Sequence, residues 1–378
     1  TWHLRNKNAG GPSDLKFVYG RVGPRGDDIA IVGDWDGDGD DTVGIVRGKT
    51  WYLRNRHAGG RADEAHAFGR AEDWKAVAGG FAEPTQQRIL QRNGPTTEPT
   101  TDSDPIVAAP SSWSEAWATR DYTKIRAWYR ANTGIAAAGL DEGDLKPSGS
   151  LTTSRDGQVI EGVRVSGSIN VMHQDVTIRN VMVVNDGGTI PINVGFGAGI
   201  RRLTVENVSL IGTGGAAEYK QALGATFLTE GVDASRVYIN GFGGGFRLSH
   251  RGNDSVDLSM VENIRIHPGS HNTGTSFRGG DGKSLTRSWI EGSTSSALSL
   301  YPDVEPVTNF VARQNLFDGG TFSVHGGDDK TYGSSTTASF TDNLFTRDHQ
   351  YGPLTSFDRS RSGRVWSGNS YLDGTPVR

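Results

Sequence analysis

Arginine, tyrosine and histidine recur at matching places in a series of short apolar segments in the C-terminal half of the chain. Side chains of a β-strand alternate between its two faces, so the apolar members of each segment are predicted to point inward. Their neighbours then form one outward column. The aligned segments are 246–250, 275–279, 298–302, 322–326 and 354–358. The outward positions are Arg247, Ser276, Ser299 and Ser323, followed by Ser249, Arg278, Tyr301 and His325.

This column suits the binding and cleavage of an anionic sugar. Arginine binds carboxylates through a two-pronged fork. Cleavage of a uronate by β-elimination needs a group that neutralises the carboxylate, a base for the C5 proton and an acid for the leaving oxygen. The candidates are Arg278, helped by Arg247 or Arg251, as neutraliser; His325 or His271 as base, with Lys283 in reserve; and Tyr301 as acid. Further substrate-binding candidates are His250, Lys220, Asp303 and Asp328.

The acidic residues after these segments allow a second interpretation. Asp281, Asp303 and Asp328 are placed at equivalent ends of three successive turns, and rungs of a sheet lie ~4.8 Å apart. Two carboxylates that are one or two rungs apart would therefore have the separation found in retaining or in inverting glycoside hydrolases. The same residues could instead bind Ca²⁺ or simply form turns. A glycoside hydrolase and a non-catalytic glycan-binding or adhesion protein are therefore the alternatives to a lyase.

The elements that would hold these residues are predicted from a recurring strand pattern. Segments such as 176–181 and 203–208 repeat a β-branched run that ends in Asn and an apolar residue, and the later turns carry Asn315, Asn343 and Asn369. Stacked asparagine amides form a ladder along the axis of a repetitive fold. One such rung per turn predicts a right-handed parallel β-helix, whose turns bury their inward residues against each other.

Residues 131–378 resemble the secreted bacterial β-helix proteins of the pectate-lyase superfold. The likeness rests on the segments 132–135, 151–162 and 176–180. It implies an extracellular protein and a polysaccharide lyase that uses Arg or Lys, or a His/Tyr pair, often beside calcium. The same superfold also carries hydrolases, epimerases and binding proteins.

The N-terminal part contains an internal repeat. Trp2-His-Leu-Arg-Asn6 returns 49 residues later as Trp51-Tyr-Leu-Arg-Asn55, and short apolar runs between Gly and Asp predict β-hairpins. Residues 1–94 resemble FG-GAP/VCBS-type repeats, which implies a calcium-stabilised module for adhesion or spacing. Alternating carboxylates with glycines between them can converge on Ca²⁺. The predicted ligands are Asp34, Asp36, Asp38, Asp40 and Asp41.

A linker and a helix separate the repeat module from the β-helix. Residues 95–110 are rich in Pro and Thr and predict an extended linker. Aromatic residues at helical spacing between Ser112 and Ala131 predict an amphipathic helix that covers an end of the coil. The predicted all-β organisation is therefore a module at 1–94, a linker at 95–110 and a β-helix domain with its capping helix at 111–378.

Composition narrows the classes of function. The formal net charge is −4, which argues against nucleic acid as a partner. The chain has no Cys, so disulfides and thiolate chemistry are excluded. No apolar run approaches the ~18 residues of a membrane span. We therefore expect a secreted, monomeric lyase that acts on an anionic polysaccharide, with structural calcium in the N-terminal module and a further calcium site considered for the groove.

Overall fold

The chain separates into two units, Thr1–Gln91 and Arg92–Arg378, which are described one at a time. The computed structural model describes residues 2–4, 13–20, 28–33, 42–47, 50–67, 109–186, 189–194, 201–214, 221–224, 230–248, 253–265 and 272–378. Most of the predicted linker at 95–110 lies outside these ranges, so its boundaries stay a prediction.

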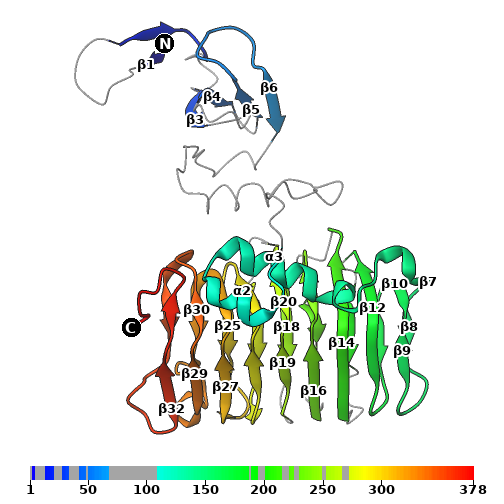
Figure 1. Ribbon diagram of the computed structural model, residues 1–378. Coiled ribbons are helices and arrows are strands. Elements are labelled where there is room, and N and C mark those ends of the chain that lie inside the picture. Colours follow the sequence, from blue (N-terminus) through cyan, green and yellow to red (C-terminus); the bar gives the residue numbers. More distant parts are fainter. Residues whose placement is uncertain are drawn as a thin grey trace. The chain divides into compact units, whose positions relative to one another are not determined.

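The described residues of the first unit form two small antiparallel sheets (Figure 1). One pairs β1 (Trp2–Leu4) with β2 (Leu15–Phe17), and the other has the order β3 (Ile29–Gly33), β4 (Thr42–Arg47), β5 (Thr50–Leu53), β6 (Glu64–Ala67). Trp2 lies opposite Phe17, and Trp51 lies opposite His66. Trp51 follows Trp2 by 49 residues, and His66 follows Phe17 by the same 49 residues. The sequence repeat is therefore also a repeat of strand pairing.

The second unit is a parallel β-helix, as the sequence predicts, whose stacked turns are visible in Figure 1. Its described residues contribute 25 strands to one hydrogen-bonded sheet. Its first strands are β7 (Lys146–Ser148), β8 (Leu151–Thr152), β9 (Val159–Glu161), β10 (Val163–Ser166), β11 (Ile169–Val171), β12 (Thr177–Asn185), β13 (Ile192–Val194), β14 (Arg201–Gly212), β15 (Gln221–Gly224), β16 (Glu230–Ser235), β17 (Tyr238–Asn240), β18 (Gly244–Leu248), β19 (Ser255–Asp257) and β20 (Met260–Glu262). The later ones are β21 (Thr275–Phe277), β23 (Ser284–Thr286), β24 (Trp289–Gly292), β25 (Ser296–Leu300), β27 (Phe310–Arg313), β28 (Leu316–His325), β29 (Ala338–Thr341), β30 (Leu344–Phe345), β31 (His349–Thr355), β32 (Arg364–Ser367) and β33 (Ser370–Tyr371). The described residues also form a separate strand pair, β22 (Gly280–Asp281) and β26 (Val307–Thr308), and the 3₁₀ turns η1 (Gly134–Ala138), η2 (Glu142–Asp144) and η4 (Gly333–Ser335).

The core fills the interior of the coil. Its early turns stack Val and Ile, whereas its later turns stack aromatic rings. Ring centroids are 4.9 Å apart for Phe277 and Phe310, 6.0 Å for Phe310 and Phe340, and 5.0 Å for Phe340 and Phe357. Each turn therefore buries its inward residues against the next, and a modest apolar fraction is sufficient for a continuous core.

The predicted asparagine ladder is present, but it does not run through every turn. Its buried part joins Asn315, Asn343 and Asn369, whose Nδ2–Oδ1 distances are 3.0 and 2.9 Å. Two serines extend it toward the N-terminus, because Ser288 N donates to Asn315 Oδ1 and Ser259 N donates to Ser288 Oγ. A side-chain oxygen at this corner is what the neighbouring backbone N–H requires, and Ser supplies it as well as Asn.

Removing one rung of this ladder should destabilise the coil. In Asn343→Ala, the backbone N–H and the side-chain amide of Asn315 both lose their buried acceptor. Each unsatisfied buried donor costs about 1–3 kcal/mol. Urea unfolding measures the loss, and Asn193→Ala is the control because it removes only a 3.4 Å contact with Asn170. Equal losses in the two variants would contradict a structural role for the ladder.

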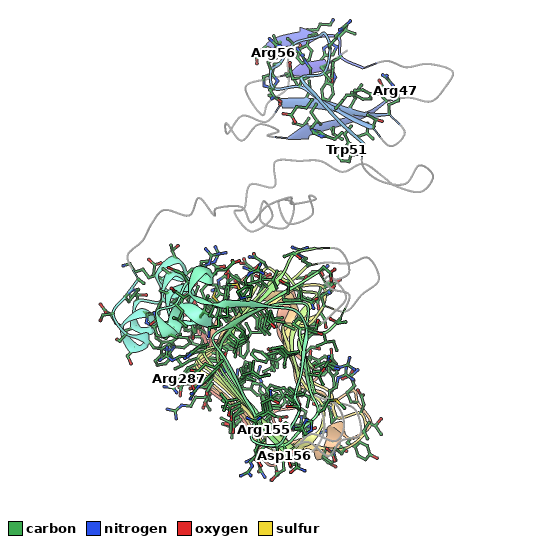
Figure 2. All side chains as sticks on the ribbon, turned by 90° about the vertical axis from the view of Figure 1, so that its right-hand side faces the viewer. Arg47, Trp51, Arg56, Arg155, Asp156 and Arg287 are labelled. Atoms are coloured by element: carbon green, nitrogen blue, oxygen red, sulfur yellow. The ribbon has the colours of Figure 1, made fainter. Side chains whose placement is uncertain are left out.

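Two helices in the described part of the chain cover a side of the coil rather than its end, which corrects the prediction of a single capping helix. α2 (Trp113–Thr119) and α3 (Tyr122–Asn132) begin at the N-caps Ser112 and Asp121. Figure 2 shows them against the outer surface of one sheet. Their apolar residues pack on side chains from successive turns, namely Leu258, Met260, Trp289, Leu316 and Leu344. No helix in the described part of the chain is long and apolar enough to span a membrane.

Candidate functional site

The strand register confirms the first part of the predicted outward column. Arg247 on β18 is paired with Ser276 on β21, and Ser276 with Ser299 on β25. The apolar residues beside them are buried inside the coil, as expected from alternation along a strand. The column therefore lies on the outer face of these strands.

The predicted register is wrong by two positions at the next turn. Ser299 is paired with His325 on β28, whereas the sequence alignment places it beside Ser323. The alignment assumes that Phe322 points into the core, but its ring is only partly buried and contacts the exposed Tyr351 at 5.6 Å between centroids. A shift of two keeps Val324 and His325 on their predicted faces, so His325 moves along the column without leaving it.

Cationic and aromatic groups gather around Tyr301. The centroid of its ring lies 5.1 Å from the guanidinium carbon of Arg278, 5.4 Å from Lys330 Nζ and 5.8 Å from the centroid of His325. We call Arg247, Arg278, Tyr301, His325, Asp329 and Lys330 the Tyr301 cluster. Three of the predicted residues, Arg278, Tyr301 and His325, are thus brought together by consecutive turns.

Asp329 is a member of this cluster that sequence reasoning missed. His325 Nε2 lies 3.1 Å from Asp329 Oδ1, and Lys330 Nζ lies 3.4 Å from Asp329 Oδ2. Its position four residues after His325 was the available signal, but Asp328 was the residue predicted from the sequence. Burial alone would raise the pKa of Asp329, but the charges of His325 and Lys330 hold it below its usual value.

The protonation of His325 follows from its surroundings. Burial lowers the pKa of His325, although the charge of Asp329 opposes this effect. The imidazole is therefore neutral at pH 7. Its Nδ1 is buried without a hydrogen-bond partner among the described residues. A neutral imidazole with an uncommitted nitrogen is able to accept a proton.

Positive charge in the cluster is incompletely compensated. Burial lowers the pKa of Arg247, and the charge of Arg278 lowers it further. Among the described residues, neither guanidinium forms an ion pair with a carboxylate. Arg278 Nε, Ser299 Oγ and Ser323 Oγ are also buried without a hydrogen-bond partner there. Buried polar atoms are normally satisfied, so this concentration of unpaired donors indicates a place where an anionic ligand or water completes the bonding.

The three aspartates of the alternative interpretation do not form one column. Asp281 is paired with Thr308, not with Asp303. It accepts hydrogen bonds from Thr308 Oγ1 at 2.6 Å and Asn309 Nδ2 at 2.8 Å, which lower its pKa. The equivalence predicted for Asp281 and Asp303 is therefore wrong.

Asp328 has a structural role. It accepts hydrogen bonds from the buried Arg364 at 2.8 Å and from Arg361 at 3.3 Å, and its carboxylate also contacts the backbone N–H of Asp358. Burial alone would raise its pKa, but the hydrogen bonds from Arg364 and Asp358 and the charges of both arginines hold it below the usual value. Asp303 is exposed.

Lys283 is placed inside the coil and is not a candidate base. Its side chain is 0% exposed and forms an ion pair with Asp254, which is 2% exposed. The prediction assumed an exposed residue after the strand, but Lys283 occupies an inward position just before β23.

The remaining predicted residues cannot be placed. Lys220, His250, Arg251, His271 and the predicted calcium ligands Asp34, Asp36, Asp38, Asp40 and Asp41 lie outside the described residues. Within the part of the chain that the structure describes, no group of three or more His, Asp or Glu side chains is arranged to hold a metal ion.

Comparison with family models, with curated proteins and with solved structures found no match to this chain.

Proposed function

We propose that the β-helix unit binds a uronate-containing polysaccharide at the Tyr301 cluster and cleaves it by β-elimination. The observation that carries the proposal is the pair Arg247 and Arg278, half-buried near each other without an acidic partner among the described residues. A substrate carboxylate would supply the missing counter-charge through bidentate hydrogen bonds. The same contact would acidify the C5 proton next to that carboxylate.

The proton-transfer roles are divided between the two rings of the cluster. His325 is the base and Tyr301 is the acid for the leaving oxygen. Asp329 accepts a hydrogen bond from Nε2 of His325 and thereby leaves the lone pair on Nδ1. Because Nδ1 is buried as the ring now stands, the imidazole must rotate or shift when substrate binds.

The glycoside-hydrolase alternative receives less support from the structure. A hydrolase needs one carboxylic acid whose pKa is raised so that it can donate a proton. Hydrogen bonds to Asp281 and Asp328 instead lower both pKa values, and these bonds come from permanent partners in the protein. A non-catalytic glycan-binding protein would use the same arginines without the two rings.

Ultraviolet absorbance tests the proposal directly. The protein is mixed with a panel of polyuronides, once with added Ca²⁺ and once with chelator. A rising absorbance reports the unsaturated product of elimination and identifies the substrate. New reducing ends without absorbance would indicate hydrolysis, and binding without either product would indicate a glycan-binding protein.

Asp329→Asn should shift the pH profile of activity. The acidic limb of kcat/KM reports protonation of the base in the free enzyme, and the pKa of His325 is already lowered by burial. The charge of Asp329 opposes this lowering, so its removal should move the acidic limb to still lower pH. Asp342→Asn is the control, because Asp342 is 54% exposed and pairs only loosely with Arg313 at 3.7 Å. An unchanged limb in Asp329→Asn would show that His325 is not the titrating base.

For the first unit we propose a calcium-stabilised spacer outside the cell. Ca²⁺ at about 100 times its dissociation constant would stabilise the unit by about 2.7 kcal/mol. Chelator should therefore lower its Tm in a calorimetric scan of the whole chain, and the double variant Asp36→Asn/Asp38→Asn should abolish that response. A chelator effect that survives in the variant would place the calcium elsewhere.

A further inference from the structure

The interior of the β-helix holds an amine in contact with a carboxyl group. Asp254 and Lys283 occupy the same inward position on successive turns, since Ser255 and Ser284, the residues after them, are paired between β19 and β23. The backbone fixes this arrangement, because Ser284 N donates to the carbonyl of Asp254 at 2.9 Å. Lys283 Nζ is in contact with Asp254 Oδ2.

Water has almost no access to this pair. The two side chains are 0% and 2% exposed. On either side along the same inward position lie Val232 and Phe310, which both belong to the apolar core. An apolar environment disfavours separated charges, so it favours proton transfer from the ammonium to the carboxylate within the contact. This transfer gives the reactive form of the pair, a neutral amine beside a neutral carboxylic acid.

The other oxygen of the carboxyl group is already held by a donor. Val232 N donates to Asp254 Oδ1 at 2.9 Å. A fixed backbone N–H at this oxygen stabilises negative charge that develops there during attack on the carbonyl carbon. Burial also raises the pKa of Asp254 to about 6, against the opposing effect of Lys283. The carboxyl group is therefore polarised, and the neutral form that an amine can attack is reached more readily than in an exposed aspartate.

We propose that Lys283 and Asp254 condense to an intramolecular isopeptide bond that links two successive turns of the β-helix. The lone pair of neutral Nζ forms a bond to Cγ, and the C=O π pair moves onto Oδ1 beside the N–H of Val232. This electron pair on Oδ1 then re-forms the C=O bond, and the Cγ–Oδ2 bond breaks. Oδ2 leaves as water with its own proton and one proton from Nζ. The products are an amide and one water, and no oxidant or other reactant is required. Fixed contact between the reacting groups substitutes for external activation.

The mass of the denatured full-length protein tests this bond. The wild-type chain is expected to be lighter than its sequence by one water, and a branched peptide should join the segments that contain residues 254 and 283. Lys283→Arg should restore the full sequence mass. Asp254→Asn should instead lose one ammonia, a change that an ion pair cannot produce.

A succinimide at an Asp-Gly step, such as Asp281-Gly282, also costs one water. Hydroxylamine cleaves a succinimide and leaves an isopeptide intact, so a mass deficit that survives hydroxylamine and maps to residues 254 and 283 supports the proposal. A wild-type chain at its full sequence mass after prolonged incubation of the folded protein would overturn it. The pair would then be a buried ion pair only. Neither outcome depends on whether the protein is a lyase.

Discussion

Arg278→Ala is expected to lower kcat/KM on the cleaved polyuronide by about 10²–10³-fold, the usual cost of removing one preorganised group that stabilises developing charge. Arg278 stacks on Tyr301 and has a buried Nε without a partner among the described residues. Its guanidinium would face the substrate carboxylate, whose charge moves toward an enediolate as the C5 proton leaves. The fall should therefore appear mainly in kcat.

The conservative variant and a matched control sharpen this prediction. Arg278→Lys keeps the charge but loses the planar fork, so most of the activity should stay lost. Arg313→Ala removes a 58% exposed arginine, paired only loosely with Asp342 at 3.7 Å, and should leave the rate unchanged. If Arg278→Ala raised KM alone, the residue would bind the ground state and the transition state equally. If it changed neither parameter, the proposed site would be wrong.

Sequence patterns could predict the coil because each turn repeats the same physical requirement. Inward positions need apolar volume, and the corner of the ladder needs a side-chain oxygen for the next backbone N–H, as at Asn315 and Asn343. These requirements are local, so they recur at recognisable spacing. Helical structure between Ser112 and Ala131 was also predictable, but its division into two helices at Arg120 was not. The surface that the helices cover was not predictable either, because an amphipathic face does not specify its partner.

The candidate site was predictable as a column and less so in its details. Arg247, Ser276 and Ser299 follow from alternation, whereas the place of His325 depends on how many residues turn the preceding corner. Phe322 misled the alignment because it packs on Tyr351 outside the core. The inward position of Lys283 was not predictable either, because a buried lysine is expected only when its partner, here Asp254, is known.

The largest expected effect on stability concerns Glu262, the carboxylate that joins α3 to the β-helix. Its side chain is 2% exposed and accepts hydrogen bonds from Arg126 at 3.0 Å, from Arg130 at 3.0 Å and from the hydroxyl of Tyr238 at 2.6 Å. Glu262→Ala leaves two partly buried guanidinium groups without this acceptor. Removing one partner of a buried ion pair costs about 3–5 kcal/mol. Urea unfolding should show this loss, together with the release of the aromatic side chains of α3 from the sheet.

The acid dependence of stability provides a second, independent measure of the same network. Burial alone would raise the pKa of Glu262, but the charges of Arg130 and Arg126 outweigh it and hold the pKa below the usual value of 4.5. A carboxyl group with a lowered pKa in the folded state stabilises the protein fully above pH 4.5, and this contribution is lost as the pH falls through the folded value. In Glu262→Gln the corresponding slope of unfolding free energy against pH should disappear.

Glu161→Gln is the matched control for this prediction. Glu161 also pairs with an arginine, Arg179, at 2.9 Å, but the two side chains are 42% and 46% exposed. Solvent screens such an exposed pair, so its loss should change the stability little. If the Glu161 and Glu262 variants lost stability equally, burial of the Glu262 network would not be what fixes the helices to the side of the coil. A loss confined to Glu262 would show that one buried carboxylate, rather than the apolar contacts alone, determines where the helices dock.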